Sequence, residues 1–215
     1  MSITALQEHI RKKKTPLALG LGPEANRLPA PVVKRFTDLY GESVMARSEA
    51  LRYHGTQLMA QAAQRLPAVV LRADRYLLCG AMGLDVLSNL VHMARSQGLY
   101  AIVDARCADP AVWLGGEVNA DAVTISPYYG TAAAGEDKAL FALVRTAEPG
   151  ATEVQNLMAG DRRLFLAAGG GAASFLFYRR FCGRGMPSTS AMPTASATAI
   201  LKVEMPFASA RALLP

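Results

Sequence analysis

Short apolar runs alternate with longer segments of helical spacing along most of this chain. The apolar runs are five or six residues long and occupy positions 17–21, 67–71, 99–103, 121–125 and 139–144. Before and between these runs, apolar residues recur every three or four positions over 2–14, 31–64 and 83–98, as in amphipathic helices. The second of these segments is predicted to break near Gly41 and at Gly55. Apolar strands separated by helices predict a parallel sheet with helices on both faces.

Four of the five predicted strands run directly into polar or turn-forming residues. The sequence reads "GPE" after the first strand, "DARCAD" after the third, "SPYYG" after the fourth and "RTAEPGA" after the fifth. Functional groups gathered at the carboxyl ends of parallel strands are typical of the active face of a (β/α) barrel. A doubly wound sheet would gather ligands in a similar way, but no GxGxxG follows the first strand. The predicted fold is therefore an α/β (β/α) TIM-type barrel, and with five legible strands it is expected to be open or irregularly completed.

Composition and charge exclude several classes of protein. The chain has 215 residues, 51% of them hydrophobic and 19% charged, which is enough for one globular domain with a real core. The net charge is +6, but the basic run 11–14 carries no interleaved aromatic residues, so we predict a solvated helix end and no nucleic-acid partner. No apolar run approaches the roughly 20 residues that span a bilayer, so we expect no membrane partner either.

Cysteine and histidine patterns give no metal centre. Three cysteines are scattered without a CxxC pair, as expected for reduced thiols in a cytoplasmic protein, and the three histidines lie on separate predicted helices without ligand spacing. Cys107 lies between aspartates whose negative charge disfavours a thiolate, so we do not expect it to act as a nucleophile.

The densest chemistry follows the third apolar run, in "IVDARCADP" at 102–110. This stretch places Asp104, Arg106 and Asp109 within six residues. On the residues alone, the cluster is compatible with a salt-bridged turn or with a present or former active site.

Five segments together resemble one enzyme family. The segments "PLALGLGPEANRLP", "LPAVVLRADRYLLCGAMG", "GLYAIVDARCADP", "NADAVTISPYYG" and "LVRTAEPGATEVQNL" are similar in order and spacing to the orotidine 5'-phosphate decarboxylase family, in particular to its longer bacterial subgroup. The similarity covers roughly residues 1–165. It implies a barrel that converts orotidine 5'-phosphate to uridine 5'-phosphate and carbon dioxide for pyrimidine biosynthesis, without a cofactor, as a homodimer.

The resemblance assigns roles to the acidic cluster. In the family, a network written DxKxxD, with one earlier lysine, stabilises the carbanion and donates the replacing proton. Here Asp104 corresponds to the first aspartate and Asp109 to the last, which the family delivers across the dimer interface. Arg106 stands at the position of the proton-donating lysine, and Val70 at that of the earlier lysine. Because the arginine guanidinium keeps its proton far above neutral pH, it is a poor proton donor, so the replacements predict weak or absent turnover.

The resemblance also marks substrate-binding positions. Gly22 replaces the aspartate that binds the ribose hydroxyls, and Ala147 replaces a serine that contacts the pyrimidine. Ser126 and Pro127 of "SPYYG" fall in the substrate site, and Trp113 falls near a threonine of the dimer interface.

The sequence loses the resemblance after about Leu166. The family would supply three further strands there, with a glutamine and an arginine that grip the substrate phosphate. This chain has instead the triple glycine 169–171 and a Ser, Thr, Ala and Pro stretch at 187–199. We therefore predict a partial barrel over 1–168 and an irregular tail over 169–215, poorly ordered at about 186–199. A truncated or frame-shifted gene would give the same pattern.

Three functions stay open from the sequence. The first is a divergent orotidine 5'-phosphate decarboxylase with a nucleoside monophosphate ligand. The second is a non-catalytic pseudoenzyme or incomplete gene product of the same ancestry. The third is an interaction protein that uses a half-barrel scaffold.

Overall fold

The computed structural model describes the chain in several separate stretches. They are residues 1–22, 27–126, 129, 137–143, 152–153, 157–159, 162–163, 175–177 and 199–203. The helices are α1 (Ile3–Lys13), α2 (Ala30–Tyr40), α3 (Val44–Ala62), α4 (Ala73–Leu77), α5 (Gly80–Ser96) and α6 (Ala111–Leu114). The strands are β1 (Leu17–Leu21), β2 (Ala68–Arg72), β3 (Tyr100–Cys107), β4 (Ala122–Ile125), β5 (Ala139–Leu143), β6 (Met158–Ala159), β7 (Arg162–Arg163), β8 (Phe175–Phe177) and β9 (Ala199–Val203). No helix in the described part of the chain is long and apolar enough to cross a bilayer.

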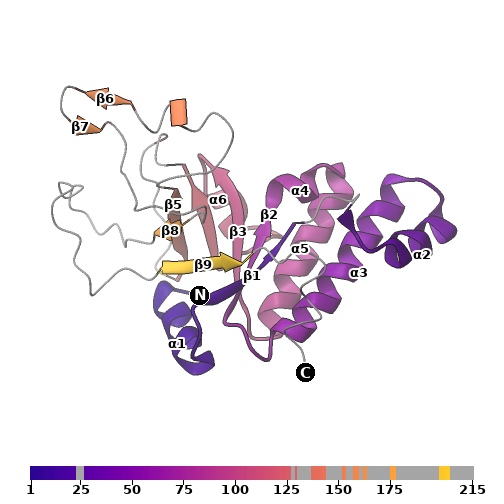
Figure 1. Cartoon of the computed structure of the whole chain (residues 1–215), viewed down its shortest axis with the longest axis horizontal. Coiled ribbons are helices and arrows are strands. Elements are labelled where there is room, and N and C mark those ends of the chain that lie inside the picture. The colour runs from indigo at the N-terminus through magenta and orange to yellow at the C-terminus, as the bar shows by residue number, and fades with distance from the viewer. Residues whose placement is uncertain are drawn as a thin grey trace.

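Strands β1 to β5 form a parallel sheet in chain order (Figure 1). Gly20 pairs with Val70, and Val70 pairs with Ile102 on the next strand. The five apolar runs and their parallel arrangement are therefore confirmed. Strand β3 is longer than the predicted 99–103 and continues to Cys107, so that Asp104 and Arg106 lie on the strand and not in the loop after it.

Two strands from the last part of the chain close the barrel. Strand β8 runs antiparallel to β5, and β9 runs antiparallel to β8 and parallel to β1. The result is a closed barrel of seven strands, fewer than the eight parallel strands of a complete (β/α) barrel, in keeping with the expected irregular completion. The sequence pattern did not reveal β8 or β9. Of the stretch 186–199, predicted to be poorly ordered, residues 186–198 lie outside the described residues and Ala199 begins β9.

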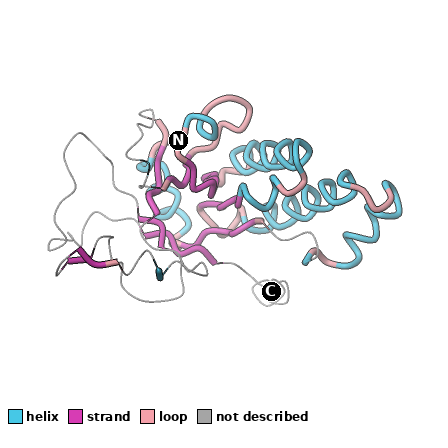
Figure 2. Tube along the Cα trace, turned by 90° about the horizontal axis from the view of Figure 1, so that it is seen from above, coloured by secondary structure: helices cyan, strands magenta, loops and turns pink. Residues whose placement is uncertain are grey.

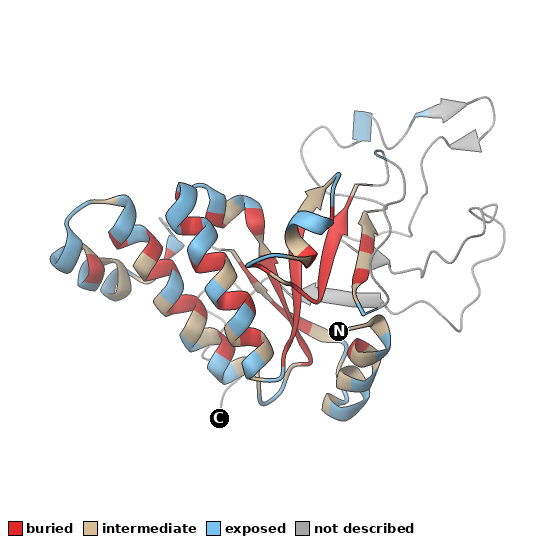
Figure 3. Cartoon of the chain, turned by 180° about the vertical axis from the view of Figure 1, so that it is seen from behind, coloured by how far each residue is buried: buried red, intermediate tan, exposed pale blue. Residues whose placement is uncertain are grey.

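The strands separate two apolar cores. Side chains alternate across each strand, so Leu19 and Val69 face α3 and α5, whereas Ala18 and Val70 face the barrel interior. Leu6 of α1 is fully buried against this interior core and covers the amino-terminal end of the barrel. The long helices extend to one side of the strands (Figures 2 and 3).

The α2–α3 segment bears out one predicted helix break and corrects the other. Helix α2 ends at Gly41, whose φ of 66° suits glycine, and the Ser43 side chain then accepts a hydrogen bond from Ala46 N at 3.1 Å to start α3. Helix α3 continues through Gly55 without a break. A Cβ atom at Gly55 would lie 3.0 Å from Leu90 Cδ1, so this glycine lets α3 pack closely on α5.

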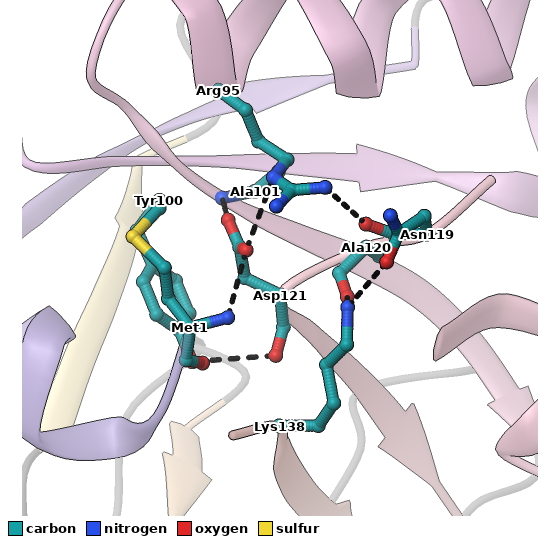
Figure 4. A network of polar contacts seen from close by, with 8 residues as sticks. All are labelled: Met1, Arg95, Tyr100, Ala101, Asn119, Ala120, Asp121 and Lys138. Carbon is teal, nitrogen blue, oxygen red and sulfur yellow. Dashed lines mark hydrogen bonds and ion pairs between the residues drawn. The ribbon is translucent and has the colours of Figure 1, made fainter. Parts of the chain in front are cut away.

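A buried carboxylate organises the amino-terminal end of the barrel (Figure 4). Asp121 is fully buried and accepts hydrogen bonds from the Met1 amino group and from Ala101 N, both at 3.0 Å. Arg95 Nε lies 3.4 Å from the same carboxylate. Beside this group, Lys138 Nζ donates to Asn119 Oδ1 at 2.6 Å. The polar network ties α5 to the starts of β3, β4 and β5.

Candidate active site at the carboxyl ends of β2, β3 and β4

Strand alternation carries three polar side chains to the inner face of the barrel mouth. Val70, Ile102 and Ala122 belong to the interior core. Two residues further along each strand stand Arg72, Asp104 and Thr124, which therefore point to the same side, one layer nearer the carboxyl ends. Because parallel strands end together, these three side chains meet at one edge.

Asp104 and Thr124 form the buried centre of the site. The Thr124 hydroxyl donates to Asp104 Oδ1 at 2.8 Å, and it accepts a hydrogen bond from Arg106 N at 2.9 Å. Thr124 is fully buried and Asp104 is 9% exposed. One hydroxyl therefore fixes a carboxylate and the backbone of the neighbouring arginine.

Arg106 occupies an irregular point of β3. The pairing with β4 shifts between Val103 and Cys107, as in a β-bulge, and Arg106 has φ 50°, a left-handed conformation that is uncommon for a residue with a side chain. Its Nε lies 3.6 Å from Asp104 Oδ1. The bulge turns the guanidinium back towards the carboxylate two residues earlier.

A second ion-pair group adjoins the first on β2. Arg72 donates from Nε and Nη2 to the two carboxylate oxygens of Asp74, at 3.1 and 2.6 Å, and Arg75 Nε lies 3.6 Å from Asp74 Oδ2. Burial raises the pKa of the Asp74 carboxyl, and the hydrogen bond from Arg72 lowers it. The charges of Arg72, Arg75 and Arg106 lower it further, so the pKa lies below its usual value.

Asp109 is not part of the ion pair between Asp104 and Arg106. Its Oδ1 accepts a hydrogen bond from Ala111 N at 2.9 Å in the turn that leads into α6, and the residue is exposed. The three residues of the sequence cluster are thus divided into an ion pair inside the barrel mouth and a turn residue outside it.

The predicted substrate-binding positions are only partly described. Val70 is fully buried in the interior core, and Ser126 is half-buried after β4. Gly22 has φ 143°, and a Cβ atom there would lie 2.6 Å from Cβ of Arg72, so an aspartate does not fit this backbone. Pro127 and Ala147 lie outside the described residues. Trp113 is half-buried and packs against the outer core.

The pKa of the Cys107 thiol lies above its usual value. Burial raises its pKa, the charge of Asp109 adds to this, and a backbone hydrogen bond only partly opposes them. Within the described residues, no group of three His, Cys, Asp or Glu side chains is placed to hold a metal ion.

Sequence reasoning missed Thr124, Arg72, Asp74 and Arg75. Thr124 and Arg72 could have been found from the two-residue period of a strand, because each lies two positions after an inward-facing apolar residue of its own strand. Asp74 and Arg75 lie on the short helix α4, which the apolar pattern did not predict.

Comparison with known proteins gives a consistent family likeness, although no family model matches the chain. The orotidine 5'-phosphate decarboxylase of Caldicellulosiruptor saccharolyticus is 25% identical over 185 residues, covering 74% of this chain and 61% of the relative. The enzyme of Thermomicrobium roseum is 27% identical over 168 residues, covering 73% of this chain and 55% of the relative. The chain therefore spans less than two thirds of the length of these curated relatives.

Solved structures give the same likeness. Leishmania donovani UMP synthase matches with a TM-score of 0.56 at 25% identity, over 76% of this chain and 35% of that protein. Leishmania donovani OMP decarboxylase matches with a TM-score of 0.55 at 25% identity, over 76% of this chain and 62% of that protein. The Plasmodium berghei orotidine 5'-monophosphate decarboxylase, at 15% identity and a TM-score of 0.59 over 74% of this chain and 66% of that protein, shares the fold.

Proposed function

We propose that this chain, a divergent member of the orotidine 5'-phosphate decarboxylase family, binds a pyrimidine nucleoside monophosphate at the barrel mouth and decarboxylates orotidine 5'-phosphate very slowly or not at all. The observation that carries the proposal is Arg106, which stands at the position of the family's proton donor and is paired with Asp104. A guanidinium keeps the positive charge there, but it does not release a proton to a carbanion near neutral pH.

The position of the second lysine supports the same conclusion. Val70 is fully buried among apolar side chains of the barrel interior. An isopropyl group cannot orient the carboxylate of Asp104, which is held instead by the Thr124 hydroxyl. The electrostatic preorganisation on which this chemistry depends is therefore reduced to one ion pair.

A homodimer is part of this proposal. Asp109 points out of its own site, as it should if it completes the site of a second copy. Exposed apolar side chains on or directly after α4, on α5 and on α6, the elements that follow the ends of β2 and β3, would be covered by that copy. They are Leu77, Leu78, Met82 and Val112.

The test is a decarboxylation assay that follows loss of the orotate absorbance with purified protein. The unchanged chain is expected to show no turnover, and Arg106→Lys, Val70→Lys and their combination are measured beside it, with circular dichroism to establish folding. Turnover by the unchanged chain at about 1 to 1000 per second, as is typical of enzymes, would overturn the proposal. We expect the double variant to stay inactive as well, because Gly22 leaves the ribose without its aspartate.

Binding of uridine 5'-monophosphate is measured separately by calorimetry. Binding without turnover supports a nucleotide-binding pseudoenzyme. The absence of both would favour the interaction protein on a half-barrel scaffold.

A further inference from the structure

The barrel mouth carries three guanidiniums at the ends of two neighbouring strands. Arg72 ends β2, Arg75 lies one turn later on α4, and Arg106 lies near the end of β3. Arg72 pairs directly across the sheet with Asp104, the ion-pair partner of Arg106. The three side chains are 19%, 29% and 34% exposed, so their charged groups stand at the boundary between the barrel and solvent.

A carboxylate of the chain already lies among these guanidiniums. Asp74 receives two hydrogen bonds from Arg72 in the fork geometry that arginine uses for carboxylate and phosphate groups. Arg75 lies beside Asp74, and the positive charge of Arg106 also lowers the pKa of the Asp74 carboxyl. The Asp74 side chain is 55% exposed, so solvent or a dissolved anion can reach the same guanidiniums.

We propose that Arg72, Arg75 and Arg106, here called the arginine cluster, bind the carboxylate or phosphate group of a small ligand, with Asp74 as an internal competitor for the same guanidiniums. In the described part of the chain, the arginine cluster sets three positive charges against the two negative charges of Asp74 and Asp104. Asp104 is fixed to Arg106 and Thr124 inside the barrel, whereas Asp74 is on the exposed side and is the carboxylate that a ligand displaces.

The arginine cluster lies beside β2 and β3, and its binding of an oxyanion does not require that the ligand be a nucleotide. Inorganic pyrophosphate therefore tests the arginine cluster by itself. Uridine, uridine 5'-monophosphate and orotidine test it within the proposed function, because the second adds a phosphate to uridine and the third adds a carboxylate. Tighter binding of uridine 5'-monophosphate than of uridine identifies a phosphate site, and tighter binding of orotidine than of uridine identifies a carboxylate site.

The experiment is calorimetric titration of the full chain with these four compounds. Pyrophosphate is expected to bind. Asp74→Asn should bind it several-fold more tightly, since the internal competitor loses its charge, and Arg72→Gln with Arg106→Gln should weaken it by about tenfold or more. Asp85→Asn on α5 makes the same change in net charge as Asp74→Asn, and Arg11→Gln with Lys12→Gln on α1 makes the same change as the double arginine variant. These positions are exposed and lie away from the arginine cluster, so both controls should have little effect.

Two results would overturn the proposal. The first is no binding of pyrophosphate by the unchanged chain or by Asp74→Asn, with both folded by circular dichroism. The second is an equal response to Asp74→Asn and Asp85→Asn, which would assign the effect to net charge. Pyrophosphate binding without any response to the nucleotides would support the arginine cluster and count against the proposed nucleotide function alone.

Discussion

The Thr124 hydroxyl donates a hydrogen bond to Asp104 Oδ1 at 2.8 Å, in a part of the barrel mouth where Thr124 is fully buried. This hydroxyl lies on β4 and also accepts from the backbone of Arg106 on β3. The Asp104 carboxylate is therefore held by a neutral hydroxyl that bridges two strands, with the Arg106 guanidinium beside it.

Replacement of Thr124 by valine should destabilise the barrel. Valine has nearly the same shape but leaves Asp104 and Arg106 N without their shared partner, which should lower the free energy of unfolding by about 1 to 3 kcal/mol. Denaturant unfolding measures this loss. Thr124→Ser keeps the hydroxyl and should recover most of the stability, whereas a valine variant as stable as the unchanged chain would contradict the bridging role of the hydroxyl.

Introduction of an aspartate at Gly22 should harm the fold. Gly22→Asp forces a Cβ atom to within 2.6 Å of Arg72 Cβ at a backbone φ of 143°. Gly98 also has a positive φ, of 76°, and nothing lies within 4 Å of a Cβ placed there, so Gly98→Asp measures the cost of an aspartate at a left-handed glycine without a close approach. Thermal melting should show a larger fall for Gly22→Asp, and similar falls would contradict the close approach of Arg72.

Removal of the buried carboxylate of Asp121 should loosen the other end of the barrel. Asp121→Ala leaves Ala101 N without its acceptor and Arg95 Nε without its ion-pair partner, and an unsatisfied buried donor costs about 1 to 3 kcal/mol. Asp85→Ala, on the exposed surface of α5, serves as the control. Hydrogen exchange at Ala101 N provides a local readout, and slow exchange in the Asp121→Ala variant would contradict the assigned bond.

Buried His54 should make stability fall in mild acid. Burial lowers its pKa in the folded chain, so the unfolded chain binds the proton more tightly. As pH falls through the unfolded value of about 6.5, the free energy of unfolding should decrease until the lower folded pKa is passed. Well above the unfolded pKa, His54 is neutral in both the folded and the unfolded chain and has no effect on the pH dependence of stability.

Denaturant unfolding at about pH 7.5 and about pH 5.5 measures this dependence, because the two values bracket the unfolded histidine. His54→Gln should show a smaller difference between the two conditions than the unchanged chain. His92→Gln, at an exposed position on α5, leaves His54 in place and should keep the full difference. An unaltered difference in His54→Gln would assign the acid sensitivity to another group.

The sequence determined the parallel strands, because the identity of a buried strand is local. Five apolar runs of the right length, each between helical segments, were enough to place β1 to β5, and the residues after them pointed to the barrel mouth. The proposed loss of proton transfer is likewise a matter of residue identity, because it follows from the chemistry of arginine at position 106 and valine at position 70.

Tertiary structure decided what those residues contact. Whether Asp104, Arg106 and Asp109 form one cluster depends on the bulge in β3 and on the turn into α6, which separate Asp109 from the other two. Thr124 lies in the site because the pairing of β3 with β4 brings it to Asp104, 20 positions earlier in the chain. Strands β8 and β9 join the barrel through hydrogen bonds to distant strands. Such contacts join distant segments through the register and handedness of the closed sheet, which no local pattern of apolar and polar residues specifies.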